Sequence, residues 1–217
     1  MRQLLYISTA EYFKLPYANN SGIKEAFKIM SGKDVPYDVE NRSYTFGSAL
    51  DAILTDPNTM DTTGLTDDEV KLLYPMCRSI ERNSTYNALF RGNHSQRVWV
   101  DTTMPISFEG INTTIPGKCK YDWWYPRQDF GGDLKSTLTK TEEAFRKAAM
   151  WFEYHVQAAW YMDVTQTDRF VIIAVSKLNF EVFTMSFKRG DALYEQGKAK
   201  YQQYAAAWWK LNGHKAI

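Results

Sequence analysis

Hydrophobic positions follow helical spacing in the first part of the chain and strand-like spacing in much of the rest. Before residue 95, apolar residues recur every three or four positions in several segments, which indicates amphipathic helices. Ser21 and Thr66 stand where N-cap residues are favoured, and Asp56-Pro57 ends one of the segments. The predicted helices cover about residues 22–30, 44–54 and 66–83.

The pattern changes after Ser95 to short β-branched and aromatic runs separated by Gly and Pro, which favours an antiparallel meander. These runs span residues 97–100, 104–108, 111–115 and 118–125, and a further one spans 131–137. A helix from 141 to about 162, strands at 169–175 and 180–187, and a helix from 189 to about 211 follow. We therefore expect an α/β (α+β) fold with a mixed central sheet flanked by helices. The chain, 1–217, is expected to be one domain, with a helical N-terminal layer over 1–94 and an α/β core over 95–217.

Composition excludes several classes of protein. The 217 residues include 26 basic and 25 acidic ones, so the net charge of +1 rules out a strongly basic nucleic-acid coat. Two widely separated cysteines exclude a zinc ribbon and a four-cysteine iron–sulfur cluster, and two reduced thiols are expected in a cytoplasmic protein. No apolar run approaches the roughly 18 residues of a membrane span, so no membrane partner is expected. A hard-cation site built from carboxylates stays open.

Candidate chemistry lies on two neighbouring predicted strands. Asp122 is on the first, while Asp133 and Lys135, two residues apart, point to the same face of the second. Two carboxylates and an ammonium on one sheet face are costly to bury, and a divalent cation such as Mg²⁺ or Mn²⁺ would resolve the conflict. The metal would activate a water and hold a phosphate oxygen, and the lysine would orient the water or stabilise the transition state.

The alternative is an edge-strand ion pair with a solvent-facing Asp122, because surface ion pairs are common. The chain contains a second acid-x-lysine, Glu69-Val70-Lys71, in a polar helix start without strands around it. The strand context and the helix that follows distinguish Asp133 and Lys135 from this pair. On that helix Gln157 and Tyr161 are four residues apart and share one face.

Together these residues resemble three successive motifs of the PD-(D/E)xK nucleases, in particular the lambda-type and RecE-like (exodeoxyribonuclease VIII) phage exonucleases. The matching segments are Asp122, Asp133-Leu134-Lys135-Ser136-Thr137 and Gln157-Ala158-Ala159-Trp160-Tyr161. Two weaker matches lie upstream, at 46–57 and at 20–24, and the resemblance covers about residues 17–165. It implies a restriction-endonuclease-like core.

The resemblance also implies roles for individual residues. Asp51, Asp122, Asp133 and the backbone carbonyl of Leu134 would bind metal. Lys135 would position or activate the water, Gln157 would orient Lys135 or the scissile phosphate, and Tyr161 would support DNA or the motif. Asp51 departs from the family, which has His at this place; an all-oxygen site favours Mg²⁺, but the change would also fit an altered or lost activity.

Phosphate contacts need positive charge, and the candidate DNA-binding residues lie near these motifs. They are Ser21, Lys24, Lys118, Lys120, Arg146 and Lys147. The expected function is a Mg²⁺-dependent deoxyribonuclease, acting as a 5′-to-3′ exonuclease on the ends of linear duplex DNA in phage-type recombination. By resemblance, the partners would be a single-strand annealing protein and further copies of the chain in a ring, in a bacterial cytoplasm. The rivals are a catalytically inactive DNA-binding or assembly module with the same fold, and an endonuclease of the same superfamily.

Overall fold

The computed structural model describes residues 1–32, 37–89, 91 and 94–213, and the side chains of all of these except 37–43, 94 and 95. Within these residues the strands form one six-stranded sheet in the order β1-β2-β3-β4-β5-β6. The strands are β1 (Arg2–Leu5), β2 (His94–Phe108), β3 (Ile111–Tyr125), β4 (Phe130–Thr137), β5 (Arg169–Ser176) and β6 (Val182–Lys188). The helices are α1 (Thr9–Lys14), α2 (Asn20–Met30), α3 (Tyr37–Thr55), the short 3₁₀ helix η1 (Pro57–Thr59), α4 (Asp67–Arg82), α5 (Ser84–Leu89), α6 (Glu142–Trp151), α7 (Tyr154–Thr165) and α8 (Ala192–Asn212).

The sheet is mixed, as the sequence predicts. Neighbouring strands are antiparallel except β4 and β5, which run parallel in a ladder from Gly131↔Phe170 to Thr137↔Ser176. A parallel pair needs a crossover connection, and α6 and α7 supply it. The helix that carries Gln157 and Tyr161 is therefore part of the crossover that follows the strand of Asp133 and Lys135.

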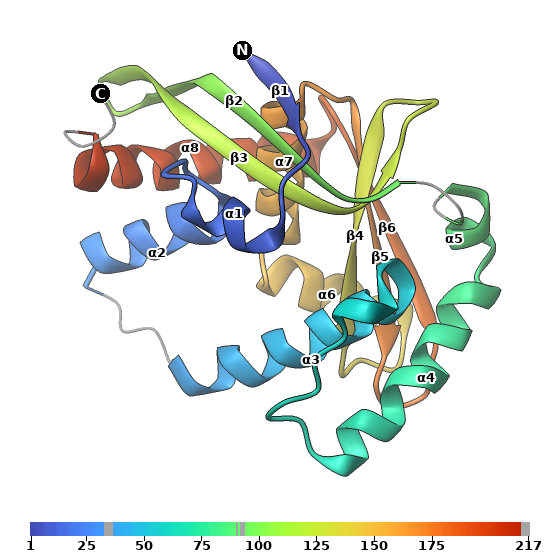
Figure 1. Cartoon of the computed structure of the whole chain (residues 1–217). Coiled ribbons are helices and arrows are strands. Elements are labelled where there is room, and N and C mark those ends of the chain that lie inside the picture. The colour runs from blue at the N-terminus through green and yellow to red at the C-terminus, as the bar shows by residue number, and fades with distance from the viewer. Residues whose placement is uncertain (33–36, 90, 92–93, 214–217) are drawn as a thin grey trace.

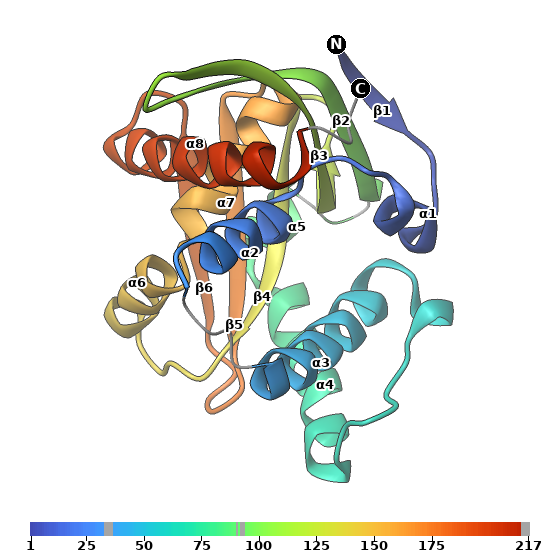
Figure 2. The ribbon, with the colours of Figure 1, turned by 90° about the vertical axis from the view of Figure 1, so that its left-hand side faces the viewer.

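The two faces of the sheet carry two separate hydrophobic clusters. Alternate β5 residues, such as Ile172 and Ile173, belong to opposite clusters because successive strand side chains point to opposite faces. One cluster includes residues of α2, α6, α7 and α8, and the other includes residues of α3, α4 and α5. Figure 2 shows α2 and α8 on one side of the sheet and α3 and α4 on the other.

Two features of the N-terminal region differ from the prediction. The helices expected to form one layer over 1–94 are divided between the two faces of the sheet, and β1 joins the sheet by pairing with β2. A four-residue strand is too short to show a clear alternation, so its sequence gives no signal. The assignment of helices to faces depends on tertiary packing and not on their own periodicity. The single-domain organisation stays a prediction.

The expected meander of short strands forms a long β-ribbon instead. The four runs between residues 97 and 125 join into β2 and β3, which pair along most of their length. The register shifts between Asp101 and Met104, where the sequence predicts a gap between two strands. The strand continues through this irregularity instead of ending there. Figure 1 shows the β2–β3 ribbon running obliquely to β4, β5 and β6, and β3 pairs with β4 only near its end.

The expected helix over 141–162 is broken into α6 and α7. Glu153, between them, has a φ of +58°, a left-handed conformation that a residue with a side chain rarely adopts. Its carboxylate accepts hydrogen bonds from Lys200 (3.0 Å) and Tyr204 (2.8 Å) of α8 and lies 3.2 Å from the ammonium of Lys24 on α2. These contacts hold the corner between α6 and α7 in place.

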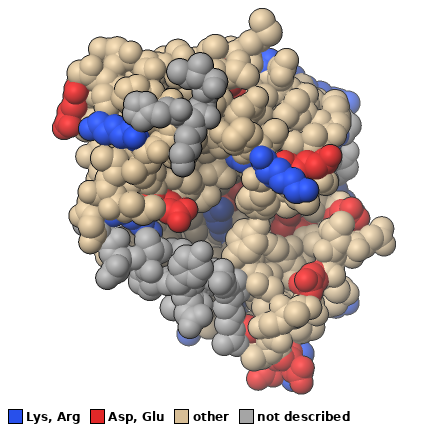
Figure 3. Space-filling view, turned by 60° about the vertical axis from the view of Figure 1, so that its left-hand side comes forward, with Lys and Arg blue, Asp and Glu red and all other residues tan. Residues whose placement is uncertain are grey.

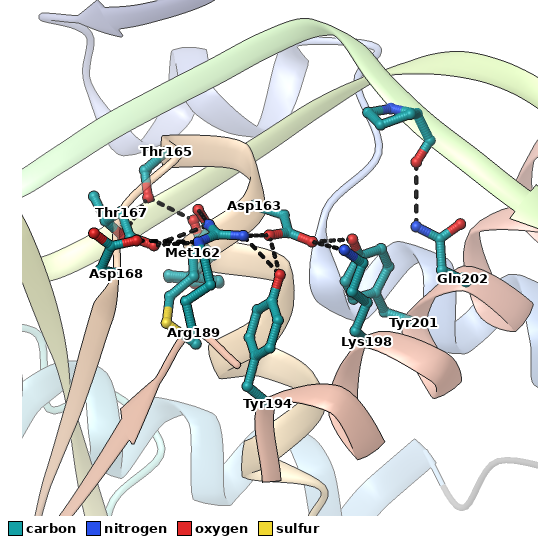
Figure 4. A network of polar contacts seen from close by, with 12 residues as sticks. Met162, Asp163, Thr165, Thr167, Asp168, Arg189, Tyr194, Lys198, Tyr201 and Gln202 are labelled. Carbon is teal, nitrogen blue, oxygen red and sulfur yellow. Dashed lines mark hydrogen bonds and ion pairs between the residues drawn. The ribbon is translucent and has the colours of Figure 1, made fainter. Parts of the chain in front are cut away.

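A polar network fixes the other end of α7. The carboxylate of Asp163 accepts from the Arg189 guanidinium (2.5 Å) and the Tyr194 hydroxyl (2.7 Å), and also from the Tyr201 hydroxyl. Arg189 also donates to the carbonyl oxygens of Met162 and Thr167. Figure 4 shows the network joining α7 to the segment after β6 and to α8. Because a nearly buried charge is costly unless it is paired and hydrogen-bonded, this network anchors the helix that faces β4.

Two expectations from composition concern thiols and membranes. Cys77 and Cys119 are both free and buried. No helix within the described residues is both long and apolar enough to cross a bilayer.

Candidate active site

The candidate site lies where β3 and β4 separate. Their pairing runs from Tyr125↔Phe130 to Trp123↔Gly132, so Asp122 and Asp133 stand at the next position along the ladder. Beyond the end of the backbone ladder a side-chain hydrogen bond joins the two strands: Asp122 Oδ2 accepts a hydrogen bond of 2.7 Å from the Leu134 backbone N–H. The fork therefore places the carboxylate of one strand beside the peptide of the other, next to Asp133.

Asp133 and Lys135 lie on the same face of β4, as predicted, and that face is covered by α7. Gln157 of α7 donates from Nε2 to Asp133 Oδ1 at 2.9 Å, and the Lys135 ammonium forms an ion pair with Asp133 Oδ2. The Asp133 residue is 5% exposed, while the Lys135 side chain is 26% exposed. The aspartate is therefore held from two sides, and the lysine reaches the surface of the site.

Asp51 of α3 contributes the third carboxylate. Its Oδ2 accepts a hydrogen bond from Gln96 of β2, while its Oδ1 is buried without a hydrogen-bond partner. Burial raises the pKa of Asp51 to about 7; nearby Lys120 opposes the rise and Asp133 adds to it. Helix α3 thus places a buried and incompletely hydrogen-bonded carboxyl group near the carboxylates of β3 and β4.

Burial and neighbouring charges also shift the pKa values of Asp122 and Lys135. Burial, followed by repulsion from Asp51 and Asp133, raises the pKa of Asp122 well above its usual range. Burial alone would lower the pKa of Lys135, but attraction to Asp133 outweighs it and the pKa lies above the ordinary value. The lysine is therefore a fixed cation at neutral pH, suited to hold negative charge and not to remove a proton.

The donor chemistry of the site fits a hard divalent cation. Asp51 Oδ1 and Asp133 Oδ2 are buried oxygens without a hydrogen bond, and Asp133 Oδ2 forms an ion pair with the Lys135 ammonium. Carboxylate oxygens are the ligands that Mg²⁺ takes. Among the described residues, however, no three His, Cys, Asp or Glu side chains are gathered closely enough to hold a metal as they stand. The residues fit the ion chemically, and binding it requires their side chains to close in.

Tyr161, the last of the predicted catalytic residues, lies in the core. It is 9% exposed, and its ring packs edge-on against Tyr121 (5.0 Å between centroids) and Phe170 (5.3 Å). It supports the helix and strands behind the site. Gln157 donates a hydrogen bond to Asp133, and its expected role of orienting Lys135 or the scissile phosphate stays a prediction.

Two residues of the site were not found from the sequence. Gln96 holds Asp51, and its partner lies 45 positions away in the chain, so only the folded structure brings them together. The Lys135 ammonium lies 5.4 Å from the centre of the Tyr154 ring. Tyr154 precedes Gln157 by three positions, a spacing that places both on one face of a helix and could have identified it.

The six predicted DNA-binding residues have different surroundings. Lys118 is 3% exposed and donates to the carbonyl oxygens of Tyr12 (2.7 Å) and Leu15 (2.8 Å), so it offers no charge to a phosphate and we correct its assignment. Lys120 donates to Thr9 Oγ1, and Lys24 is held by Glu153. The other three are more open: Ser21 is exposed in α2, while Arg146 and Lys147 form surface pairs with Glu142 and Glu143 on α6.

The molecular surface is not uniformly basic on the face that Figure 3 shows. Figure 3 shows one face of the molecule with charged side chains of both signs scattered over it. The same face is hollowed between its upper and lower parts, and basic and acidic atoms lie inside the hollow.

Comparison with known proteins identifies related folds. A family model described as a PDDEXK-like domain of unknown function (DUF3799) matches residues 17–216. A candidate exonuclease from Eubacterium rectale aligns over 98% of this chain and 89% of its own, with 12% identity and a TM-score of 0.63. A phage-related exonuclease from Haemophilus somnus (12% identity, 94% and 99% coverage) and an alkaline exonuclease from Laribacter hongkongensis (15%, 95% and 95%) both align with a TM-score of 0.42. No curated protein matches. At 12% identity, the likeness to the Eubacterium rectale protein shows the fold alone.

Proposed function

Because the chain belongs to the family of PDDEXK-like domains, we propose that it is a Mg²⁺-dependent deoxyribonuclease that hydrolyses DNA phosphodiester bonds. The observation that carries the proposal is the cluster at the β3–β4 fork. Asp122 is fixed on the Leu134 peptide, and Asp133 is fixed between Gln157 and Lys135. A surface ion pair, the alternative considered from the sequence, would not be buried or bonded in this way.

We assign each residue the role that the resemblance implies and that its contacts support. Asp51, Asp122, Asp133 and the Leu134 carbonyl would hold Mg²⁺, with Mn²⁺ as a substitute. When bound, the ion supplies Lewis acidity toward the scissile phosphate and the attacking water. Lys135, a permanent cation, stabilises the negative charge that develops on the phosphate and orients the water. Gln157 keeps Asp133 in place.

We propose the finer features from the resemblance to lambda-type and RecE-like enzymes. The substrate would be the ends of linear duplex DNA, degraded 5′ to 3′ in phage-type recombination in a bacterial cytoplasm. The partners would be a single-strand annealing protein and further copies of the chain in a ring. A covalently closed circular duplex separates this mode from an endonuclease, because only the latter cleaves it.

The test is digestion of linear duplex DNA with 5′-phosphate ends, in Mg²⁺ or EDTA, by the wild type and Lys135→Ala. We expect release of nucleotides with Mg²⁺ only, and a decrease in rate of about 10²-fold or more in the variant, as for loss of one transition-state donor. Lys71→Ala is the matched control, since Lys71 has the same acid-x-lysine pattern but an exposed ammonium paired with Asp68. It should leave the rate unchanged.

Two observations favour a second function, an inactive DNA-binding or assembly module. Asp51 stands where the resembling family has His, and the described carboxylates do not form a ready metal cluster. If the wild type binds DNA but cleaves neither linear nor circular substrate in Mg²⁺ or Mn²⁺, this second function replaces the first. Restoration of cleavage by Asp51→His would then identify Asp51 as the cause.

A further inference from the structure

Two aromatic side chains are exposed at the corner between α6 and α7. Trp151 is 84% exposed and Phe152 is 58% exposed. Burying aromatic side chains of this size stabilises a fold, and neither ring at this corner makes that contribution. Single exposed apolar residues are ordinary on protein surfaces, but adjacent large rings call for a partner.

The rings continue from the surface to the candidate site. Phe152 stacks on Tyr154, with centroids 5.9 Å apart and an interplanar angle of 20°. The Lys135 ammonium in turn lies 5.4 Å from the centre of the Tyr154 ring. The exposed Phe152 ring is therefore linked through the Tyr154 ring to the Lys135 ammonium.

The corner is held rigidly in its strained conformation. Glu153 keeps its left-handed backbone while its carboxylate binds Lys24, Lys200 and Tyr204. The Lys24 ammonium also donates to the Phe152 carbonyl oxygen (3.2 Å). Backbone strain that is maintained by several surrounding contacts is a feature of binding and catalytic sites, where it pre-organises side chains.

Positive charge lies on the same helix face. Lys147 is four residues before Trp151, so the two are neighbours on α6. Its pair with Glu143 is fully exposed, at 77% and 80% for the two side chains, and such pairs contribute little and are easily exchanged. A flat apolar surface beside an exchangeable cation matches a base beside its phosphate.

We infer that Trp151 and Phe152, extended inward by Tyr154, form a platform on which unpaired bases of the substrate DNA stack next to the candidate site. The inference rests on the proposed function, since it names the single-stranded part of that substrate. Stacking is sequence-tolerant because every base has a π-face, so the platform would hold a strand end without reading its sequence.

The test is binding in EDTA, where no cleavage interferes, of a fluorescein-labelled oligothymidine and of a blunt duplex of equal length. The double variant Trp151→Ala, Phe152→Ala should bind the oligothymidine about tenfold more weakly or worse, since each stacked base contributes about 1–3 kcal/mol. Its affinity for the blunt duplex should change less than twofold. The single variant Trp151→Phe keeps a ring and should retain most of the affinity.

Tyr74→Ala is the matched control, because Tyr74 is a 56% exposed ring on α4, which packs on the opposite face of the sheet. The inference is overturned if the double variant binds oligothymidine like the wild type, or if Tyr74→Ala weakens binding equally. It is also overturned if the double variant changes the oligomeric mass in light scattering, because the rings then belong to an interface between copies.

The same proteins separate the inference from the proposed function. If the wild type digests duplex DNA while the double variant binds oligothymidine normally, the nuclease stands and the platform fails. If the double variant loses this binding while the wild type cleaves nothing in Mg²⁺ or Mn²⁺, the platform stands and the nuclease fails.

Discussion

At the scale of single residues, Asp51 is an incompletely satisfied carboxyl group of the site. One of its oxygens is buried without a hydrogen-bond partner, and burial together with the nearby Asp133 raises its pKa to about 7 against the opposing Lys120. The charged form is therefore unfavourable in the metal-free protein. A residue that costs stability where it stands is expected to serve function and not folding.

We predict that Asp51→Asn stabilises the metal-free protein. At pH 8 the raised pKa sets an upper bound of about 4 kcal/mol, and partial relaxation of the charge leaves about 1–2 kcal/mol. That corresponds to roughly 2–8 °C in the thermal midpoint for a chain of this size. Calorimetry in EDTA and in Mg²⁺ tests this: Mg²⁺ should raise the midpoint of the wild type and not of the variant.

Asp56→Asn, at an exposed aspartate of the same region, is the control and should have no effect in either buffer. Loss of stability in Asp51→Asn would contradict the prediction, because it would show that the native carboxylate is well satisfied.

The central residues of the site could be predicted because strand alternation is a local property. Asp133 and Lys135 are two positions apart and must share a face of β4. The contact of Asp122 with the Leu134 peptide could not be predicted in the same way, because it depends on where β3 and β4 separate. Gln96 likewise reaches Asp51 only through the pairing of β2 with β3.

At the scale of elements, α7 and α8 approach unusually closely at Gly197. A Cβ atom at this position would lie 2.1 Å from the His155 carbonyl oxygen, far inside contact distance with backbone that cannot rotate away. Since α7 carries Gln157, the spacing of these two helices also sets the position of the residue that holds Asp133.

We predict that Gly197→Ala destabilises the protein by about 2–3 kcal/mol, because the two helices must move apart. Gly47→Ala in α3 is the matched change: nothing lies within 4 Å of the place that a Cβ atom would take there, so the better helix propensity of Ala should stabilise by about 0.5–1 kcal/mol. Urea unfolding of both variants gives the two free energies of unfolding. Equal effects would refute the close-packing account.

Helix and strand lengths followed the sequence where local signals were strong. The helix predicted over 66–83 is α4 (Asp67–Arg82), and the strand predicted over 169–175 is β5 (Arg169–Ser176). The break at Glu153 was not predicted, because no Gly or Pro marks it. It is imposed by Lys24, Lys200 and Tyr204, which come from two other helices.

At the scale of the whole molecule, Glu153 links three helical elements and makes stability depend on pH. Burial alone would raise its pKa, but Lys24, Tyr204 and Lys200 outweigh this and lower it to about 2. A depressed acid pKa contributes stability above the unfolded value near 4.5, and the contribution is lost as pH falls toward 2. The pKa of Lys24 is lowered because its own burial outweighs the pair, which reduces the net gain.

We therefore predict that the wild type loses on the order of 1–2 kcal/mol more stability than Glu153→Gln between pH 5 and pH 2, after allowance for screening. Chemical denaturation at a series of pH values measures the difference. Glu195→Gln on α8, an exposed acid, is the control and should follow the wild type. Parallel curves for the wild type and Glu153→Gln would contradict the account.

The fold class was predictable at this scale, because the order of helices and strands with a continuous apolar run at 169–175 indicates a mixed sheet. The division of the N-terminal helices between two faces was not, because each helix has one apolar stripe that would suit either face. Charge gave no guide to a DNA surface, since the chain is nearly neutral overall.

The parallel pairing of β4 with β5 has a consequence for folding kinetics. The hairpin ladders of the sheet can close early, but this ladder joins strands separated by the whole α6–α7 crossover, and such non-local contacts are slow to form. Asp133 and Gln157 lie on the strand before the crossover and on the crossover itself. The candidate site therefore forms only after the β4–β5 ladder has closed, so a partly folded molecule would have its hairpins but not the arrangement of Asp133 and Gln157.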